Sequence, residues 1–303
     1  MSPRVVVVGS LNMDLVIRVP HLPQPGETII GHSFSQVPGG KGANQAVALS
    51  KLGAHVQMVG RVGADPFGDL LVANLTDSGV DSDSVIRTAG VSTGLALIFV
   101  DDSAENVIVL EPGANGLLVP GDVSVAADSI RDAAALLLQL EVPLETVVRA
   151  AEVANMAGVP VILNAAPARS LPDALLRLVD ILIVNETEVL ALSGSGPGEQ
   201  EAALALLARG VQSVVVTLGR EGSLLVTHEG TIFMSAFGVE AVDSTAAGDA
   251  FAAAYVVALL EGLDSRSCLR FASAAAAIKV TRPGAQPGLA SRSEVEDFVA
   301  SNG

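Results

Sequence analysis

The chain has 303 residues, half of them hydrophobic, with a formal net charge of −16, no tryptophan and only 3% aromatic residues. This length suffices for one large α/β domain or two smaller ones, and the acidic charge and scarce aromatic side chains argue against a nucleic-acid partner. No uncharged apolar run approaches the roughly 20 residues of a membrane span, and the apolar run at the start is too short for a signal peptide, so we expect a cytoplasmic protein with no membrane partner.

Short β-branched runs alternate with Ala- and Leu-rich helical runs along most of the chain. This alternation predicts an α/β fold with a mostly parallel central sheet and helices on both faces. Ligands of such sheets bind beyond the carboxyl ends of the strands. The predicted strands are Val5–Val8, His55–Val59, Ala134–Leu140, Val159–Leu163, Ile181–Val184 and Ser213–Thr217, and the predicted helices include Ala43–Leu52, Leu144–Ala157 and Glu199–Ala208.

Two segments, residues 27–37 and 91–110, have strand character and no helical pattern. In the second, apolar residues fill both alternating positions of residues 95–100, and the polar stretch 101–106 predicts a hairpin turn before Val107–Leu110. A small sheet that is apolar on both faces needs two covers, which a ligand and a second subunit would supply. An ordinary antiparallel extension packed on the core explains the pattern equally well.

Polar and Gly-rich motifs follow the first strand. Asn12 and Asp14 suit a polyol, because a carboxylate accepts hydroxyl hydrogens and an amide both donates and accepts, although such a pair more often marks a turn. Gly39, Gly40 and Gly42 lead directly into a helix and allow close approach of the backbone to a ligand, with tight helix packing as the alternative. The spacing is not that of a Walker A loop, and no Gly-x-Gly-x-x-Gly follows a strand.

Three later strands also end in polar or Gly-rich motifs. Glu141 follows one of them, and residues 185–188 follow another with two carboxylates that could hold a hydrated Mg²⁺. Residues 217–222 contain two glycines that would let a nucleotide approach the backbone. Each motif is weak alone, but polar motifs at successive strand ends together indicate a ligand site.

The most informative segment is Asp243 to Asp249, which runs into the helix predicted for Ala250–Leu260. Small residues at a helix start leave backbone N–H groups open to an anion. Asp249 places a carboxylate, a candidate general base, beside that anion, which suits phosphoryl transfer to an alcohol. The alternative is ordinary helix capping.

With these motifs the chain resembles the phosphofructokinase-B-type carbohydrate kinases, and within them the ribokinases, over essentially its full length. The resemblance is carried by residues 39–46 and 243–249, and is supported by 92–100, 105–108, 113–115 and 284–287. It implies a ribokinase-like three-layer sandwich with a small β-sheet lid. Residues 1–11, 39–90 and 111–303 would form the nucleotide-binding α/β core, and residues 12–38 and 91–110 a lid over the sugar that could also form a dimer interface.

The resemblance also implies a role for each residue that matches a family motif. Asp249 would be the catalytic base, and the turn Ala246, Ala247, Gly248 and Asp249 the anion hole. Ala96 and Ile98 would press against the apolar face of the sugar. The sugar hydroxyls would be held by Asn12, Asp14, Gly40, Lys41, Asn44, Glu141 and Asp249. The nucleotide would be bound by Asn185, Thr217, Gly219, Arg220, Gly222, Gly248 and Ser273, with Glu188 as an acid that acts on Mg²⁺ through water.

Family members bind a monovalent cation, usually potassium, beside the anion hole. Asp243 and Thr245 match two of its ligands. Lys279, Arg282 and Gly284 match positions that contribute backbone carbonyls, for which the side chain would not matter. Gly288 stands where a ribokinase can have Ser, so a hydroxyl ligand would be missing there. Ser273 similarly replaces a His that can flank the nucleotide.

The implied activity is transfer of the γ-phosphoryl group of ATP to the 5-hydroxyl of D-ribose, with Mg²⁺ and K⁺, by a homodimer. One alternative is a kinase of the same superfamily that acts on another sugar or a nucleoside. A second is a sugar-binding protein without catalysis, in which Asp249 and Gly248 would not be expected.

Overall fold

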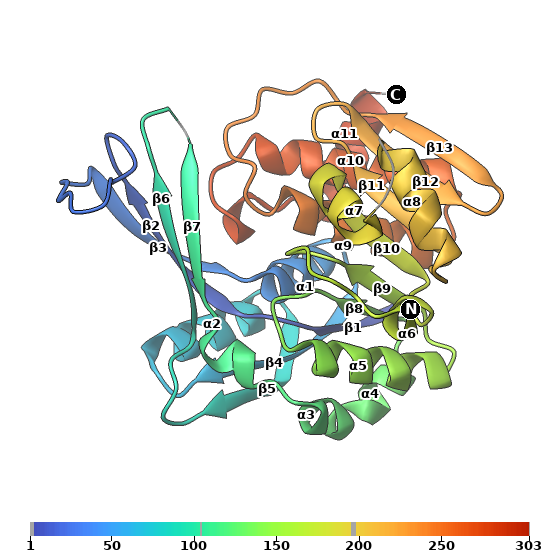
Figure 1. The fold of residues 1–303 in the computed structure, drawn as a ribbon, viewed down its shortest axis with the longest axis horizontal. Coiled ribbons are helices and arrows are strands. Elements are labelled where there is room, and N and C mark those ends of the chain that lie inside the picture. The colour runs from blue at the N-terminus through green and yellow to red at the C-terminus, as the bar shows by residue number, and fades with distance from the viewer. Residues whose placement is uncertain (1–2, 104, 195–197, 303) are drawn as a thin grey trace.

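The computed structural model describes residues 3–103, 105–194 and 198–302, so Ala104 of the predicted hairpin turn lies outside the described residues. The described strands form a nine-stranded sheet and a separate four-stranded sheet (Figure 1). The strands are β1 (Arg4–Val8), β2 (Asn12–Arg18), β3 (Ser33–Gly39), β4 (His55–Gly63), β5 (Val80–Thr88), β6 (Gly94–Val100), β7 (Asn106–Glu111), β8 (Ala135–Leu138), β9 (Val161–Asn164), β10 (Ile181–Asn185), β11 (Ser213–Thr217), β12 (Gly222–Thr227) and β13 (Gly230–Ser235).

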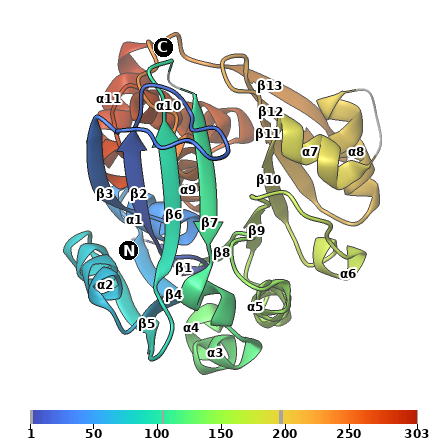
Figure 2. The ribbon, with the colours of Figure 1, turned by 60° about the vertical axis from the view of Figure 1, so that its left-hand side comes forward.

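Helices cover both faces of the larger sheet (Figures 1 and 2). None of the described helices is long and apolar enough to span a bilayer. The helices are α1 (Lys41–Lys51), α2 (Pro66–Asp77), α3 (Pro120–Val125), α4 (Ala127–Arg131), α5 (Leu144–Met156), α6 (Asp173–Leu176), α7 (Glu186–Ser193), α8 (Glu199–Ala208), α9 (Ala247–Leu260), α10 (Ser265–Val280) and α11 (Arg292–Ser301), with short 3₁₀ turns η1 (Gly113–Leu117) and η2 (Gln286–Gly288).

The larger sheet has the strand order β13-β12-β11-β10-β9-β8-β1-β4-β5. Pairing is parallel from β5 through to β11, and the hairpin of β12 and β13 extends this sheet in the antiparallel sense. The predicted α/β class with a mostly parallel sheet is therefore confirmed. All the predicted strands are present, although β8 ends at Leu138 rather than Leu140 because its pairing with β9 stops there.

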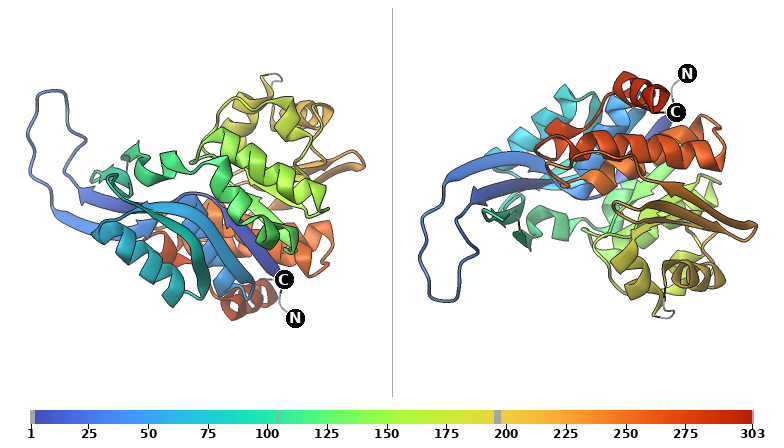
Figure 3. Two further views of the ribbon diagram at one scale, coloured as in Figure 1. Left: turned by 90° about the horizontal axis from the view of Figure 1, so that it is seen from below. Right: turned by 90° about the horizontal axis from the view of Figure 1, so that it is seen from above.

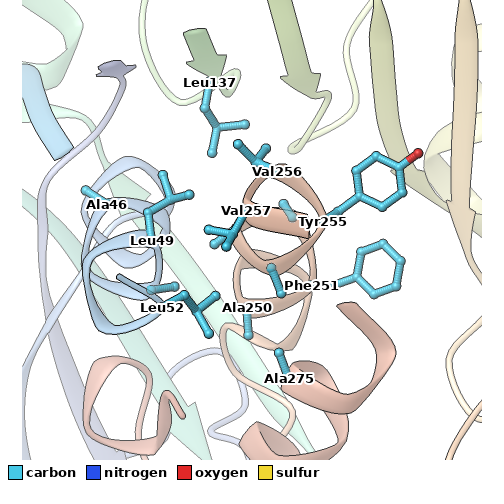
Figure 4. Packing of buried hydrophobic residues seen from close by; sticks show 14 of the residues in the cluster. Ala46, Leu49, Leu52, Leu137, Ala250, Phe251, Tyr255, Val256, Val257 and Ala275 are labelled. Carbon is cyan, nitrogen blue, oxygen red and sulfur yellow. The ribbon is translucent and has the colours of Figure 1, made fainter. Parts of the chain in front are cut away.

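Strand β1 shows why the sheet needs helices on both sides. Val5 and Val7 pack in one buried cluster with α1, α9 and α10, whereas Val6 and Val8 pack in a second cluster with α5 and its neighbours. Successive residues of a strand point to opposite faces, so an unbroken run of Val is buried only if helices cover both faces of the sheet. In the first cluster, Figure 4 shows α1 and α9 side by side, with Leu49 and Leu52 of α1 labelled between them.

The four-stranded sheet has the order β3-β2-β6-β7 and stands beside the core (Figure 2). Only three residues separate β1 from β2, so the chain passes directly from an interior strand of the large sheet into the small one. The loop between β2 and β3 projects well beyond the rest of the molecule (Figure 3). Strand character was predicted from Glu27, but β3 begins only at Ser33, because its partner β2 ends at Arg18, opposite Ser33.

Candidate active site

The carboxyl ends of β9, β10 and β11 and the start of α9 surround one cavity of about 250 Å³. Parallel strands direct their carboxyl ends to the same edge of a sheet, which brings residues far apart in sequence into one place. The cavity brings together predicted base, anion-hole, nucleotide and magnesium positions. It is lined by Lys41, Asn164, Ala166, Ile183, Val184, Asn185, Glu188, Thr217, Ser244, Ala246, Ala247, Gly248 and Asp249.

Asp249 lies in the first turn of α9 and is only 4% exposed. Its Oδ2 accepts a hydrogen bond from Asn44 Nδ2 at 3.0 Å, and its Oδ1 accepts one from Gln45 Nε2 at 2.9 Å. Both oxygens are thus held by amides from the start of α1. This geometry fixes the orientation of a carboxylate that could accept a hydroxyl proton without a histidine partner.

These two amides are themselves fixed by a buried network. Gln45 Oε1 accepts from Gln139 Nε2 at 2.6 Å, and Gln45 Nε2 also reaches Asn164 Oδ1 at 3.0 Å. Asn44 Oδ1 accepts from Gln286 Nε2 at 3.1 Å. No sequence motif predicts a role for Gln45, Gln139 or Gln286. Two of them lie inside the quoted motifs, and a glutamine in the apolar run before Glu141 is itself a signal, since buried amides need partners.

The turn before α9 has a strained conformation. Ala246 has φ 60° and is the only non-glycine residue with positive φ in the described part of the chain, a conformation that costs about 1 kcal/mol for a residue with a Cβ. The N–H of Ala247 donates to Ser244 O at 3.1 Å, whereas those of Gly248 and Asp249 donate to no other described residue. The amides without a partner among the described residues are therefore those of Ala246, Gly248 and Asp249, whereas the amide of Ala247 is already used.

One face of the small sheet carries several sugar-binding candidates. Asn12 and Asp14 are two residues apart on β2 and share a face, and the pairing of β2 with β6 places Asp14 opposite Ala96. Ile98 lies on the same face of β6, two residues beyond Ala96. Asn12 Oδ1 accepts from Asn115 Nδ2 at 2.7 Å, which orients its amide.

The Asp14 carboxyl is buried and lies close to other acids. Burial, followed by Glu141 and Asp249, raises the pKa of Asp14 to about 7, with Lys41 opposing the shift. A Cβ on Gly39 would lie 2.2 Å from Asp14 Oδ2, so only glycine fits there.

Gly40 has φ 87°, and a Cβ there would lie 2.6 Å from Asn12 N. The glycines thus let the start of α1 pack against β2, so tight packing explains Gly39 and Gly40.

Lys41 lines the cavity and is hydrogen-bonded to Glu141. Glu141 Oε2 accepts from Ser10 Oγ at 2.5 Å and from Lys41 N at 3.1 Å. Burial acts to lower the pKa of Lys41, but Asp249, Glu141, Glu188 and Asp14 outweigh it and the pKa lies above its usual value. A charged ammonium group therefore stands among carboxylates at the cavity.

Asn185 and Glu188 form a capping box at the start of α7. Glu188 Oε2 accepts from Asn185 N at 2.9 Å, and Asn185 Oδ1 accepts from Glu188 N at 2.8 Å. Burial raises the pKa of Glu188, which Asn185 N–H and Lys41 counteract in part. One carboxylate oxygen of Glu188 remains for a hydrated Mg²⁺, whose preferred ligands are oxygens.

Four nucleotide candidates do not line the cavity: Gly219, Arg220, Gly222 and Ser273. Packing against β13 explains the glycine at position 222, because a Cβ there would lie 1.9 Å from Met234 O. Ser273 is 8% exposed within α10. Gly219 has open space around it, with only Glu186 Oε1 as near as 4.0 Å.

The positions predicted to hold potassium are close together but already occupied. Lys279 is fully buried, and its Nζ donates to Asp243 O at 2.8 Å and to Arg282 O at 3.2 Å. The Lys279 carbonyl accepts from Arg282 N, and the Asp243 carboxylate accepts from Thr245 N and Gly284 N. The expectation that the side chain of Lys279 would not matter is wrong, because it occupies the space between the expected ligands. These residues do not fit a potassium ion.

The chain is similar to known carbohydrate kinases along its whole length. A family model described as pfkB family carbohydrate kinase matches residues 2–292. A ribokinase of Haemophilus influenzae is 40% identical over 303 residues, covering 99% of both chains. A deoxyribokinase of Salmonella typhi is 35% identical over 303 residues, covering 98% of this chain and 99% of the relative.

Solved structures show the same fold. The ribokinase of Arabidopsis thaliana, complexed with ribose and ATP, has a TM-score of 0.92 at 36% identity and covers 99% of both chains. The ribokinase of Thermotoga maritima has a TM-score of 0.92 at 39% identity, over 98% of this chain and 99% of the other.

Proposed function

The chain belongs to the pfkB family of carbohydrate kinases, and from this premise we propose that it transfers the γ-phosphoryl group of ATP to the 5-hydroxyl of D-ribose. The similarity to ribokinases, one of them solved with ribose and ATP, supports these substrates. The observation that carries the chemistry is Asp249, held by two amides beside the free N–H groups of Gly248 and its own backbone.

In the proposed reaction the sugar oxygen forms a bond to the γ-phosphorus while the bond from that phosphorus to the β-γ bridging oxygen breaks. The hydroxyl proton passes to the Asp249 carboxylate, which Asn44 and Gln45 hold in place. Negative charge that develops on the transferring group faces the N–H groups of Gly248 and Asp249, which need no reorganisation to stabilise it. ADP, with the electron pair of the broken bond, is the leaving group.

Positive charge for the phosphates comes from two sources. The ammonium of Lys41 lines the cavity and is kept charged by the surrounding carboxylates. Glu188 would hold Mg²⁺ through water, and that ion, bound with ATP, would neutralise phosphate charge. Asn185 and Thr217 line the nucleotide side of the same cavity, and residues 219–222 would lie further along the nucleotide.

Sugar recognition is assigned to the acids and amides of the lid side. Asn12, Asp14 and Glu141 would bind hydroxyl groups through their oxygen acceptors. Asp14 interacts with Asp249 and Lys41, Glu141 accepts from Lys41 N, and Asn12 is oriented by Asn115. Ala96 and Ile98 lie on the Asp14 face of the small sheet and would contact the apolar face of the ring. Closure of this sheet over ribose would exclude water and limit hydrolysis of ATP.

The opposite face of the small sheet supports a homodimer. Strand β7 is an edge strand, and Val107 and Val109 on it are 44% and 53% exposed. Both lie on the face opposite Asp14, as do exposed Leu97 of β6 and Phe34 of β3. A second copy would cover this apolar face and the open edge. Light scattering should give the dimer mass, and a Val109→Asp variant should be a monomer.

A substrate panel tests the proposed reaction. ADP release is measured with ATP and D-ribose, 2-deoxy-D-ribose, fructose or adenosine, and the site of phosphorylation is read by phosphorus–carbon coupling in the NMR spectrum of the product. We expect ribose to give the highest kcat/KM and a 5-phosphate. A preference for 2-deoxyribose would instead place the chain with its deoxyribokinase relatives, and no release with any acceptor would refute catalysis.

A further inference from the structure

Lys279 is a buried cationic side chain that the proposed reaction does not use. It projects from the last turn of α10 and is 0% exposed. Long charged side chains are almost never fully buried without partners. Its partners are all oxygens: Asp243 O at 2.8 Å, Arg282 O at 3.2 Å and the Asp243 carboxylate at 3.8 Å.

This oxygen cluster lies at the base of the anion turn. Asp243 is three residues before Ala246, and its carboxylate accepts from Thr245 N at 2.9 Å. The same carboxylate accepts from Gly284 N at 2.7 Å, so it ties the turn to the loop after α10. Burial lowers the pKa of Lys279, and the Asp243 carboxylate opposes that shift. With its proton kept, the ammonium holds the loop and the turn together and adds to the positive potential beside the anion turn.

Gly288 creates the space for this side chain. A Cβ at that position would lie 3.0 Å from Lys279 Cε and 3.3 Å from Arg282 O, so a serine, with a further Oγ, would compete with the lysine for the same volume. Lysine at 279 and glycine at 288 thus fit as a pair. One fills the space with an ammonium, and the other leaves room for it.

We propose that the Lys279 ammonium is a built-in cation that takes the place of a bound monovalent ion beside the anion turn, so that turnover does not depend on potassium. Three donor hydrogens on a tethered nitrogen can serve oxygens that would otherwise surround a metal ion. The charge is supplied by the chain itself, and its removal should create a need for the ion.

Ion binding by the wild-type protein gives the first test. Equilibrium dialysis against radioactive Rb⁺, a potassium substitute, is carried out without substrates. We expect no saturable binding, and equal midpoints of thermal unfolding in KCl and choline chloride at matched ionic strength. One Rb⁺ bound per chain, or stabilisation specific to KCl, would overturn the proposal. This readout is independent of the proposed sugar substrate, on which only the activity test below rests.

Turnover in different salts gives the second test. Wild-type rates of ribose-dependent ADP release should agree within about twofold in KCl, NaCl and choline chloride, a spread expected of screening alone. The double variant Lys279→Ala/Gly288→Ser removes the ammonium and adds a hydroxyl. It should be slower than wild type by about tenfold in choline chloride, less than the roughly 10²–10³-fold of a lost donor to the reacting group, because Lys279 acts on the turn from behind, and KCl should restore most of that loss.

Lys51 provides a matched control. Its Nζ also bridges two backbone carbonyls of the same loop, those of Gln286 and Leu289, both at 3.1 Å. A Lys51→Ala variant should lose loop anchoring without acquiring any response to potassium. Potassium activation of wild type, equal activation of the Lys51 and Lys279 variants, or a double variant that KCl does not rescue would each count against Lys279 as the resident cation.

Discussion

The side chains proposed to bind the sugar and those proposed to bind the nucleotide are held in different ways. On the sugar side, polar side chains bond to partners far away in the sequence: Asn44 and Gln45 to Asp249, Ser10 to Glu141. On the nucleotide side the bonds are local or weak. Asn185 and Glu188 cap a helix three residues apart, and Thr217 Oγ1 reaches only Val184 O, at 3.4 Å.

This difference separates two kinds of recognition. An alcohol that must be deprotonated needs a base and hydroxyl acceptors fixed before it binds, and buried amides achieve this at the cost of burying polar groups. A nucleotide can be bound by backbone groups at strand ends, so that no single side chain contributes much of its affinity. Substitutions on the sugar side should therefore reduce kcat or the affinity for ribose strongly, and those on the nucleotide side should have mild effects.

The largest effect is expected for Asp249→Asn. The amide cannot accept the hydroxyl proton, so kcat should fall by about 10³-fold, within the range attributed to a general base. Binding of ATP, measured by calorimetric titration, should remain within a few-fold of wild type. Near-normal turnover of this variant with ribose would show that Asp249 is not the base and that the fixed geometry of the sugar side has another purpose.

A smaller loss is expected for Gln45→Leu. This change removes the N–H that holds Asp249 Oδ1 and leaves Gln139 without its acceptor. A freer base should lower kcat by about tenfold, since positioning alone can be worth that much, and the unpaired amide should cost about 1–3 kcal/mol of stability.

Gln57 is the matched control for Gln45, because it is a buried, hydrogen-bonded amide on β4 that does not contact Asp249. A Gln57→Leu variant should lose comparable stability in denaturant titrations and keep its kcat. If both variants lose kcat equally, the effect of Gln45 is one of general stability rather than of positioning the base.

The raised pKa of Asp14 predicts that the stability of the protein depends on pH. Its pKa rises from 3.8 to about 7 on folding, so the folded state favours the protonated form, and the cost of ionisation accumulates as pH rises from 3.8 towards 7. Asp14→Asn should therefore raise the unfolding midpoint relative to wild type more at pH 8 than at pH 5. Calorimetry at the two pH values measures this difference.

Ribose binding by the wild type should strengthen as pH rises, whereas the stability contributed by Asp14 falls. If the carboxylate accepts sugar hydroxyl hydrogens, KM for ribose should rise as pH falls below about 7 in wild type. Asp14→Asn should raise KM by about tenfold at pH 8, the value of a hydrogen bond to a charged group, and remove the dependence on pH. Asn12→Ala, which adds no titratable group, should keep the wild-type profile.

The same contrast explains what could be predicted from sequence. The strands, the parallel sheet and the positions of Asn185, Thr217 and Asp249 follow from local patterns, because strand periodicity and helix-start signals are encoded by neighbours in the chain. Asn12 and Asp14 share one face of the second sheet because side chains two residues apart on a strand point the same way. This placement can be predicted once β1 is known to end at Val8.

What could not be predicted depends on long-range pairing. Gln45 bonds to Asp249 directly, and Gln139 and Gln286 support it through Gln45 and Asn44. No local pattern shows which of these amides pair. Lys279 was interpreted as a backbone position only, because sequence does not show that its side chain turns back towards Asp243 and Arg282. The sequence predicts a missing hydroxyl ligand at Gly288. In the structure, the absence of a side chain at Gly288 leaves the volume that Lys279 occupies.

The smallest effect is expected on the nucleotide side, for Thr217→Val. The hydroxyl makes one long bond, to Val184 O, and the β-branched shape is kept at the end of β11. KM for ATP should therefore rise by only about twofold to fivefold, the value of one neutral hydrogen bond, with kcat and KM for ribose unchanged. A loss as large as that of Gln45→Leu, seen in steady-state kinetics with varied ATP, would mean that the nucleotide side is also held by specific side chains, and the division between the two sides would not stand.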